Sequence, residues 1–258
     1  MISSLKAADL IGTEEINQQP LICAPLVGKN DTDILNELTN IRYKKPDVIE
    51  WRADFYEDIC DRDKVFHILQ TMKSKVPNIP ILFTIRSVHE GGESIELTER
   101  GKVSLLAALC CRGLVDIIDY ELRNDVDSIH YLRQISLRYN IQMILSYHNF
   151  KKTPECSEIV EMCKKMDHLD ADFVKVAVMP NNMDDALELL RATNEVKKSI
   201  NAKLVTISMG KFGAVSRLFG WVFGSAMTFG IGEQSSAPGQ VPVEDVRRVI
   251  EITSKYMN

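Results

Sequence analysis

The chain has 258 residues, 45% of them hydrophobic and 26% charged, with a formal net charge of −5 at pH 7. A chain of this length and composition is expected to bury a large core, and its mildly acidic balance argues against nucleic acid as the main partner. Because no segment approaches the roughly 20 consecutive apolar residues that span a bilayer, we expect a cytoplasmic protein with no membrane partner.

Short apolar runs alternate with segments of helical spacing from about residue 20 to the end of the chain. The predicted strands are residues 21–28, 48–52, 81–86, 115–121, 142–148, 171–180, 203–209 and 226–229. The predicted helices are residues 31–45, 61–74, 98–111, 128–139, 154–166, 183–198, 215–223 and 243–256, the first of them capped by Asp31. Residues 1–19 are polar and weakly patterned, and we expect an N-terminal arm or hairpin there without chemistry of its own.

Eight strand-then-helix units in about 240 residues match a parallel (β/α)8 TIM barrel, whose catalytic groups lie at the C-terminal ends of strands and in the loops that follow. An open doubly wound sheet is the competing α/β architecture, but no glycine-rich dinucleotide turn follows the first strand. No linker rich in proline, glycine or serine divides the chain. We therefore predict a single domain over residues 1–258.

The six cysteines indicate neither a disulfide framework nor a metal site. They form no C-x-x-C pair and mostly fall within apolar or helical patterns, where reduced thiols behave as small hydrophobes. They are Cys23, Cys60, Cys110, Cys111, Cys156 and Cys163. We predict no disulfide and no bound zinc.

The sixth predicted strand carries a lysine in the middle of an apolar, β-branched run. Strand alternation places Phe173, Lys175 and Ala177 on one face and three valines on the other. Burial disfavours an ammonium group, so Lys175 must either pair with a carboxylate or lose its proton and become a nucleophile. A salt-bridged or snorkelling lysine is the ordinary alternative.

Other polar side chains stand at predicted strand ends, which a barrel would bring to one rim. They are Glu50, Arg52, Arg86, Asp119, Glu121 and His148, with Arg217 after the seventh strand. Singly they have structural explanations, such as an ion pair between Glu50 and Arg52 or a hydrogen-bonded histidine. The polar loop at 232–240 is likewise an ordinary connector by composition. Together, however, these residues supply a nucleophile, a proton shuttle and an anion clamp.

The chemistry that such a set supports begins with a ketone. A lysine amine condenses with a ketone to an iminium ion, whose positive charge acidifies the neighbouring carbon. His148 could then take that proton, while the planar arginine forks would pair with a carboxylate or a phosphate. We also expect the positive field of the arginines to help keep Lys175 uncharged.

Six motifs, in order along the chain, resemble those of type I 3-dehydroquinate dehydratases. They are Glu50-Trp51-Arg52, Arg86-Ser87 with Glu90-Gly91-Gly92, Ser146-Tyr147-His148-Asn149, Val174-Lys175-Val176-Ala177, Ser216-Arg217 and Ser236-Ala237-Pro238-Gly239-Gln240. The resemblance implies a (β/α)8 barrel, usually a homodimer, that converts 3-dehydroquinate to 3-dehydroshikimate in the shikimate route to aromatic compounds. It implies no metal and no organic cofactor.

The resemblance also gives each matching residue an expected role. Lys175 would form the Schiff base, His148 would act as general acid and base, and Glu90 would orient the histidine. Arg217 would clamp the substrate carboxylate. The other substrate contacts would be Glu50, Arg52, Arg86, Ser236 and Gln240, with Met209 and Phe229 as apolar walls. One departure is visible, because Ile207 stands where some members carry methionine.

Two alternatives stay open. Another Schiff-base barrel, such as an aldolase acting on a sugar phosphate, would keep Lys175 but require a phosphate site near the seventh and eighth strands. Residues 224–230 are only weak evidence for such a site. A non-catalytic domain that binds a quinate-like ligand is the second alternative, although it should have lost Lys175 or His148.

Overall fold

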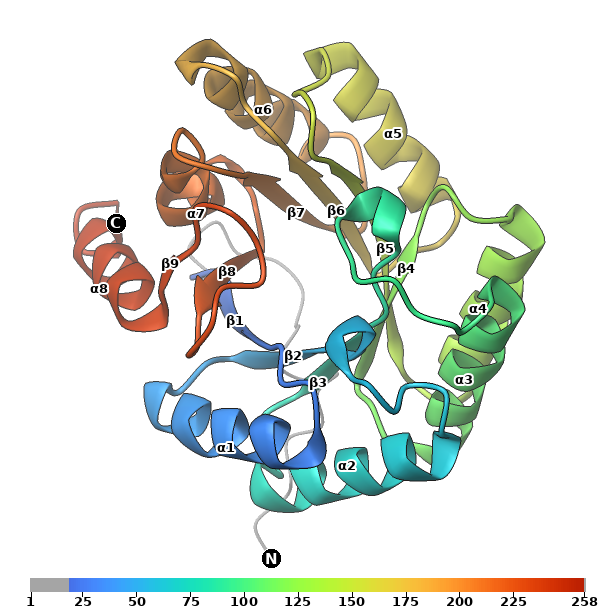
Figure 1. The fold of residues 1–258 in the computed structure, drawn as a ribbon. Helices are drawn as coiled ribbons and strands as arrows, with labels where there is room; N and C mark the ends of the chain where they lie inside the picture. Colours follow the sequence, from blue (N-terminus) through green and yellow to red (C-terminus); the bar gives the residue numbers. More distant parts are fainter. Residues whose placement is uncertain (1–18, 258) are drawn as a thin grey trace, which may run out of the picture.

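Parallel strands form one curled sheet in the computed structural model, which describes residues 19–257. Their order is β7-β6-β5-β4-β3-β2-β1-β8-β9 (Figure 1). The strands are β1 Leu21–Leu26, β2 Val48–Arg52, β3 Ile81–Thr84, β4 Ile117–Glu121, β5 Gln142–Asn149, β6 Phe173–Val178, β7 Lys203–Ser208, β8 Met227–Ile231 and β9 Val241–Pro242. All eight predicted strands are confirmed, and the two-residue β9 is an addition. The arm or hairpin expected over residues 1–19 lies outside the described residues, apart from Gln19.

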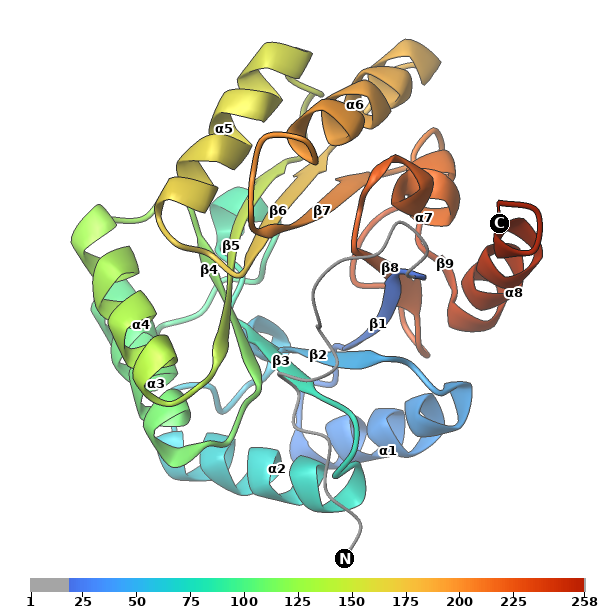
Figure 2. The same cartoon turned by 180° about the vertical axis from the view of Figure 1, so that it is seen from behind.

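Helices surround the sheet on its outer face (Figures 1 and 2). They are α1 Asp31–Ile41, α2 Arg62–Lys75, α3 Glu99–Arg112, α4 Val126–Arg138, α5 Cys156–His168, α6 Met183–Val196, α7 Ala214–Phe219 and α8 Val243–Ser254, with 3-10 turns η2 Arg42–Lys44, η3 Ala53–Phe55, η4 Val88–Glu90 and η5 Gly220–Phe223. The predicted cap of the first helix is wrong by one residue, because the Asn30 side chain accepts the Asp33 N–H. The predicted seventh helix is interrupted, since α7 gives way to a 3-10 turn after Phe219.

The cylinder closes through β1, which pairs in parallel with both β2 and β8. Within residues 19–257, β7 and β8 are the neighbouring barrel strands that share no ladder. Ser225 joins them instead: its Oγ accepts the Thr206 N–H at 3.1 Å and donates to the Met227 carbonyl at 3.1 Å. The Ala226 N–H adds a bond to the Leu204 carbonyl at 2.7 Å. The predicted (β/α)8 barrel is therefore confirmed, and the open doubly wound sheet is excluded.

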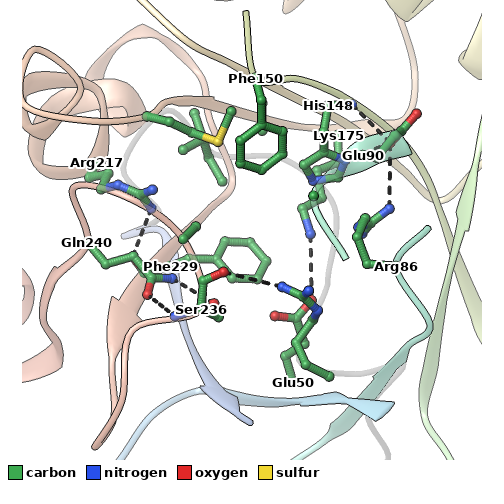
Figure 3. Close-up of a pocket in the computed structure, with 16 residues that line it drawn as sticks. Glu50, Arg86, Glu90, His148, Phe150, Lys175, Arg217, Phe229, Ser236 and Gln240 are labelled. Atoms are coloured by element: carbon green, nitrogen blue, oxygen red, sulfur yellow. Dashed lines mark hydrogen bonds and ion pairs between the residues drawn. The ribbon is translucent and has the colours of Figure 1, made fainter. Parts of the chain in front are cut away.

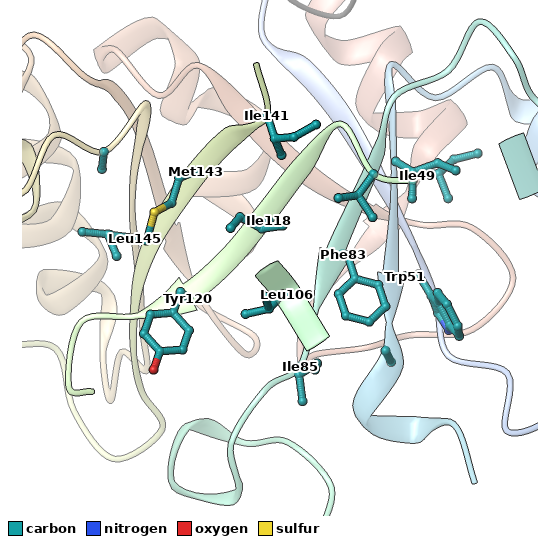
Figure 4. Close-up of a cluster of buried hydrophobic side chains, with 14 of the residues drawn as sticks. Ile49, Trp51, Phe83, Ile85, Leu106, Ile118, Tyr120, Ile141, Met143 and Leu145 are labelled. Carbon is teal, nitrogen blue, oxygen red and sulfur yellow. The ribbon is translucent and has the colours of Figure 1, made fainter. Parts of the chain in front are cut away.

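Alternation along the strands divides the core into an outer and an inner part. Figure 4 shows part of the outer core, where Trp51 packs edge-on against Phe83 with ring centroids 5.3 Å apart. On β6, the three valines belong to this outer core, whereas Phe173 and Ala177 belong to the inner one. The two faces predicted for the lysine strand are thus confirmed.

The inner core changes from apolar to polar along the strands. Its apolar layer includes Val48, Leu82, Ile117, Ile144 and Phe173. Two residues further along the same five strands stand Glu50, Thr84, Asp119, Ser146 and Lys175, each at most 4% exposed. Because polar groups buried this deeply must find partners among themselves, this second layer is the floor of a polar site.

Two further observations concern the whole of residues 19–257. No helix in this range combines the length and the apolar character needed to cross a membrane. All six cysteines lie in this range as free thiols, with Cys60 and Cys111 exposed and the other four buried.

Candidate active site

A cavity opens at the C-terminal ends of the barrel strands (Figure 3). Its empty volume is about 460 Å³, part of it open to solvent. The residues that line it are Glu50, Arg52, Arg86, Glu90, Gly91, His148, Phe150, Lys175, Ala177, Ile207, Met209, Arg217, Phe229, Ser236, Ala237 and Gln240. The structure thus brings together all eleven residues to which the sequence resemblance gave a role.

Lys175 is buried on β6 between two carboxylates. Its Nζ lies 3.3 Å from Asp119 Oδ2 and 3.7 Å from Glu50 Oε1, and 4.3 Å from the centroid of the Phe229 ring. Its ion-pair partners are carboxylates, and the expectation that arginines help to keep this amine uncharged stays a prediction. The ordinary alternative of a salt-bridged lysine is thus observed, and nucleophilic attack by this residue would require the uncharged amine.

Arg86 organises a buried group of carboxylates between β3, β4 and β5. Its Nη2 lies 2.8 Å from Asp119 Oδ2, and its Nη1 lies 3.3 Å from Glu121 Oε1 and 3.7 Å from Glu90 Oε2. The same Nη1 donates to Ser146 Oγ at 2.8 Å. Burial alone would lower the pKa of Arg86, but the three carboxylates raise it on balance. This guanidinium is therefore already engaged by protein acceptors.

Asp119 connects Arg86 to Lys175. Both cations contact its Oδ2, and its Oδ1 accepts a hydrogen bond from Ser146 Oγ at 2.6 Å. Burial would raise the pKa of this carboxyl, but Arg86 and Lys175 together lower it to about 2. Asp119 consequently stays negatively charged throughout the neutral range.

His148, at the end of β5, is held by Glu90 from the turn η4. Its Nδ1 lies 2.9 Å from Glu90 Oε2, and the same oxygen accepts the His148 backbone N–H at 3.0 Å. A ring held through Nδ1 turns Nε2 away from Glu90. Because β5 and β6 are paired with Ser146 opposite Lys175, the imidazole stands on the rim beside the lysine strand (Figure 3).

The histidine and its carboxyl partner have opposite pKa shifts. Burial lowers the pKa of His148 well below its usual value, and Arg86 and Lys175 lower it further, so the imidazole is neutral. Burial raises the pKa of Glu90 to about 8, with repulsion from Glu121 adding to the rise and Arg86 opposing it. Loss of the Glu90 proton near pH 8 makes this carboxylate an acceptor for Nδ1–H, which leaves the lone pair on Nε2.

The ion pair between Glu50 and Arg52, considered from the sequence, is not formed. Arg52 instead makes a forked pair with Asp54, with Nε at 2.9 Å from Oδ1 and Nη2 at 2.8 Å from Oδ2. Glu50 Oε1 accepts a hydrogen bond from Thr84 Oγ1 at 2.9 Å. Arg52 is thereby fixed on the rim, while Glu50 faces Lys175 and the cavity.

Arg217, near the end of α7, is only 2% exposed. Its Nη1 donates to the Phe229 carbonyl at 3.3 Å and its Nη2 to the Pro238 carbonyl at 3.2 Å. Among the residues that the structure describes, its Nε has no hydrogen-bond partner and no carboxylate pairs with it. Burial lowers the pKa of Arg217 to about 10. A buried cation without a counter-ion is costly, so this position favours an anionic ligand.

The loop between β8 and β9 borders the cavity with Ser236 and Gln240. The Gln240 Oε1 accepts the Ser236 N–H at 2.9 Å, and its Nε2 donates to Ser236 Oγ at 3.1 Å. Arg52 Nη1 donates to the Ser236 carbonyl at 3.4 Å. Gly239 has φ +73°, and a Cβ there would lie 2.2 Å from the Gly210 carbonyl oxygen. The loop therefore requires glycine to pack this closely against the end of β7.

Apolar residues form the rest of the lining. Met209 and Phe229 belong to the inner core and face the cavity, as does Ile207. Phe150 was not predicted to line the cavity; its ring lies so close to Gly91 that a Cβ there would approach it to 2.3 Å. Strand alternation could have located Phe150, because it follows His148 by two residues and continues the same face.

Three buried carboxylates stand beside the cavity: Asp54, which was not predicted, and Asp119 and Glu121, which were predicted at the rim but given no individual role. They contact the functional side chains rather than the cavity, so their importance depends on contacts between strands. Despite this concentration of acids, residues 19–257 contain no group of three or more histidine, cysteine or acidic residues that could hold a metal ion.

Comparison with known proteins gives one family from sequence and from structure. Residues 22–257 match the family model of type I 3-dehydroquinase. A 3-dehydroquinate dehydratase of Geobacillus sp. (strain WCH70) is 45% identical over 254 residues, which cover 98% of each chain. Two solved structures are also similar to this chain. The 3-dehydroquinate dehydratase of Geobacillus kaustophilus HTA426 has a TM-score of 0.91 and 41% identity over 93% of each chain.

The second structure is the type I 3-dehydroquinate dehydratase from Clostridium difficile with covalently modified comenic acid. It has a TM-score of 0.89 and 39% identity, over 92% of this chain and 93% of that one. These matches extend along nearly the whole described barrel, including all the strands that supply the cavity. The chain therefore belongs to the type I 3-dehydroquinase family.

Proposed function

We propose that this chain is a lyase that dehydrates 3-dehydroquinate to 3-dehydroshikimate through an iminium on Lys175, within the shikimate pathway of aromatic amino acid biosynthesis. The observation that carries the proposal is the convergence of Lys175, the Glu90-held His148 and the buried Arg217 on one cavity. The relatives named 3-dehydroquinate dehydratase support the choice of substrate. A cytoplasmic homodimer that needs no cofactor, as the resemblance implies, is part of the same proposal.

Arg217 binds the substrate carboxylate in this proposal. Its guanidinium is buried and held in place by two backbone carbonyls, and its Nε is without an acceptor among the described residues. A carboxylate would supply both the missing acceptor and the missing counter-charge. Ser236 and Gln240, which border the same side of the cavity, offer hydrogen bonds to the ring hydroxyls.

The covalent step joins Lys175 to the substrate ketone. The ammonium loses one proton, the neutral Nζ bonds to the carbonyl carbon, and the oxygen leaves as water. The two protons that leave nitrogen end on this water, so the ammonium and the ketone become an iminium and water with no net proton exchanged. The iminium then draws electrons from the adjacent carbon and makes its proton acidic.

His148 moves the proton that the iminium has made acidic. Its pKa is lowered first by burial, so the imidazole is neutral, and the fraction that ionised Glu90 holds as the Nδ1–H tautomer can accept a proton on Nε2. The electrons left on carbon form an enamine, which expels the hydroxyl on the next carbon. The imidazolium is a strong acid because of the same low pKa, and it protonates that departing hydroxyl. Hydrolysis of the conjugated iminium releases the enone and restores Lys175.

The two alternatives raised by the sequence gain no support from the site. A sugar-phosphate aldolase would need a phosphate site near residues 224–230, but Ser225 in that segment is committed to the junction between β7 and β8. A binding domain without catalysis would not need a nucleophile and a base, yet Lys175 and His148 both face the cavity.

Borohydride trapping tests the proposal directly. Incubation with 3-dehydroquinate should produce an ultraviolet-absorbing conjugated enone, and borohydride added during turnover should reduce the iminium to a stable amine on Lys175. Peptide mass spectrometry locates the added mass. Lys175→Ala should abolish both enone formation and trapping, whereas the matched control Lys64→Ala, an exposed lysine on α2, should retain both. An adduct at another residue, or no enone, contradicts the proposal.

A further inference from the structure

We propose that Asp119 is the counter-ion of the charged nitrogen on Lys175, both as the resting ammonium and as the iminium. This inference rests on the proposed function, because the iminium is its intermediate. Asp119 does not line the cavity and acts through Lys175, which makes it a positioning residue. Its effect on the reaction would come from fixed charge and fixed geometry.

The position of Asp119 is set by contacts on three sides. Its Oδ2 lies 3.3 Å from Lys175 Nζ and 2.8 Å from Arg86 Nη2, and its Oδ1 accepts the Ser146 hydroxyl at 2.6 Å. Ser146 lies on β5, between the strands of Asp119 and Lys175, and is paired in register with Lys175. All four residues are at most 4% exposed. The carboxylate is therefore held against Nζ without freedom to turn toward a ligand.

Two of the carboxylates that contact Arg86 lie at different distances from it and have different pKa values. It contacts Asp119 at 2.8 Å but Glu90 only at 3.7 Å. The nearer carboxylate keeps a low pKa and is a permanent charge, while the more distant one, raised to about 8, can exchange a proton with His148. Two acids whose environments separate their pKa values in this way are suited to different roles.

Other groups also face Lys175 and enter any pH profile of its reaction. From the neighbouring elements they are Cys23 on β1, Glu50 on β2, Arg86 after β3, Asp119 on β4 and His148 on β5, with Arg52 and Arg217 elsewhere on the cavity. Glu50 is the second carboxylate, but it lies further from Nζ, at 3.7 Å, and it also faces the cavity. Asp119 is thus the nearer and the more firmly held counter-ion.

The charge on the Lys175 nitrogen changes twice during Schiff-base formation, so loss of a counter-ion should alter how the reaction depends on pH. The ammonium is positive, the free amine and the carbinolamine are neutral, and the iminium is positive again. A fixed carboxylate stabilises the first and last species relative to the neutral ones between them. Without the carboxylate, the free amine should form at lower pH, but a smaller fraction of the amine should be converted to iminium.

The test measures borohydride capture of 3-dehydroshikimate on Lys175 as a function of pH, by intact-protein mass spectrometry at saturating ligand. Asp119→Asn keeps the shape of the side chain and removes the charge. The acid limb of the pH profile is the range over which the capture rate rises with pH. For Asp119→Asn this limb should move to lower pH by about one to three units, and the capture rate at the plateau above it should fall about tenfold. A second comparison in the His148→Ala background removes the imidazole from both profiles.

Ser146→Ala is the matched control, because it removes the hydrogen bond to Oδ1 and leaves the carboxylate charge in place. Its acid limb should stay within about 0.3 unit of the wild-type limb. Asp119→Glu keeps the charge and should also retain the limb. If Asp119→Asn does not fold, as judged by circular dichroism, Asp119→Glu carries the test, and displacement of its limb by more than about half a unit overturns the proposal.

The outcomes separate this inference from the proposed function. If wild-type protein is trapped at Lys175 and makes enone, but Asp119→Asn loses only plateau height and keeps the wild-type limb, Asp119 has a purely structural role and the inference is overturned. If wild-type protein is not trapped at any pH, the proposed function and this inference fail together.

Discussion

Two buried arginines, on opposite walls of the cavity, differ in how far the protein itself neutralises them. On the wall formed by β3 to β5, Arg86 has three carboxylates and a hydroxyl within contact distance. On the wall formed by β7, α7 and β8, Arg217 contacts two backbone carbonyls and, within residues 19–257, no carboxylate. The first wall is electrostatically complete, and the second needs an anion.

This difference separates chemistry from recognition. In the proposed mechanism, the complete wall holds the groups that must keep a fixed relation to one another, namely the nucleophile, its counter-ion and the imidazole with its carboxyl partner. The incomplete wall holds the group whose partner would arrive with the substrate. A site built in this way has its catalytic geometry before binding and gains electrostatic stability on binding.

The largest expected effect comes from the imidazole on the complete wall. His148→Ala should lower kcat for enone formation by about 10²- to 10⁴-fold, which is the range for a general acid–base group. Borohydride should still label Lys175, because the nucleophile remains. His67→Ala, an exposed histidine on α2, is the control and should keep wild-type kcat. Loss of labelling along with turnover would show that His148 is needed before elimination.

Of the two arginine variants, Arg86→Gln should lower the free energy of unfolding more than Arg217→Gln does. Removing this cation leaves three buried carboxylates without their shared partner, and breaking a buried ion pair costs about 3–5 kcal/mol. Urea unfolding followed by circular dichroism measures the free energy of unfolding. A loss of less than about 1 kcal/mol would mean that the carboxylates of this wall are not held by Arg86.

Arg217→Gln should affect substrate binding more than folding. The variant removes the charge-assisted hydrogen bonds to a carboxylate, worth about 1.5–3 kcal/mol, so KM should rise about tenfold to a hundredfold. The free energy of unfolding should be unchanged or higher, because a buried cation without a counter-ion is removed. An equal loss of stability in both arginine variants would contradict the claim that the protein neutralises Arg86 but not Arg217.

The smallest expected effect is a change of tautomer without a change of fold. Since the pKa of Glu90 is raised to about 8, the carboxyl keeps its proton below that pH and becomes an acceptor above it. Nitrogen-15 spectra of His148 should therefore change from Nε2–H to Nδ1–H as pH rises through about 8. Glu121→Gln removes a repulsion that raises this pKa, so it should move the midpoint to lower pH. An unmoved midpoint would exclude that repulsion as a cause.

The fold and the members of the site were accessible to sequence reasoning for a simple reason. Strand alternation has a period of two, so Lys175 could be assigned to the interior from its own strand, and a barrel brings all strand ends to one rim. The pairings were not accessible. That Arg52 pairs with Asp54 rather than Glu50, and Lys175 with Asp119, depends on the stagger between strands and on loop paths, which no single strand encodes.

The same limit applies to the junction between β7 and β8, where a serine side chain replaces a ladder. Lys175 stands on one side of this line, and Phe229 with the loop that contacts Arg217 stands on the other. A small molecule bound by both the Lys175 amine and the Arg217 guanidinium would span the β7–β8 junction, where the barrel has the fewest backbone hydrogen bonds between strands. A bound ligand would then act as an additional link between β7 and β8. The force needed to separate these two strands should therefore rise with the affinity of the ligand.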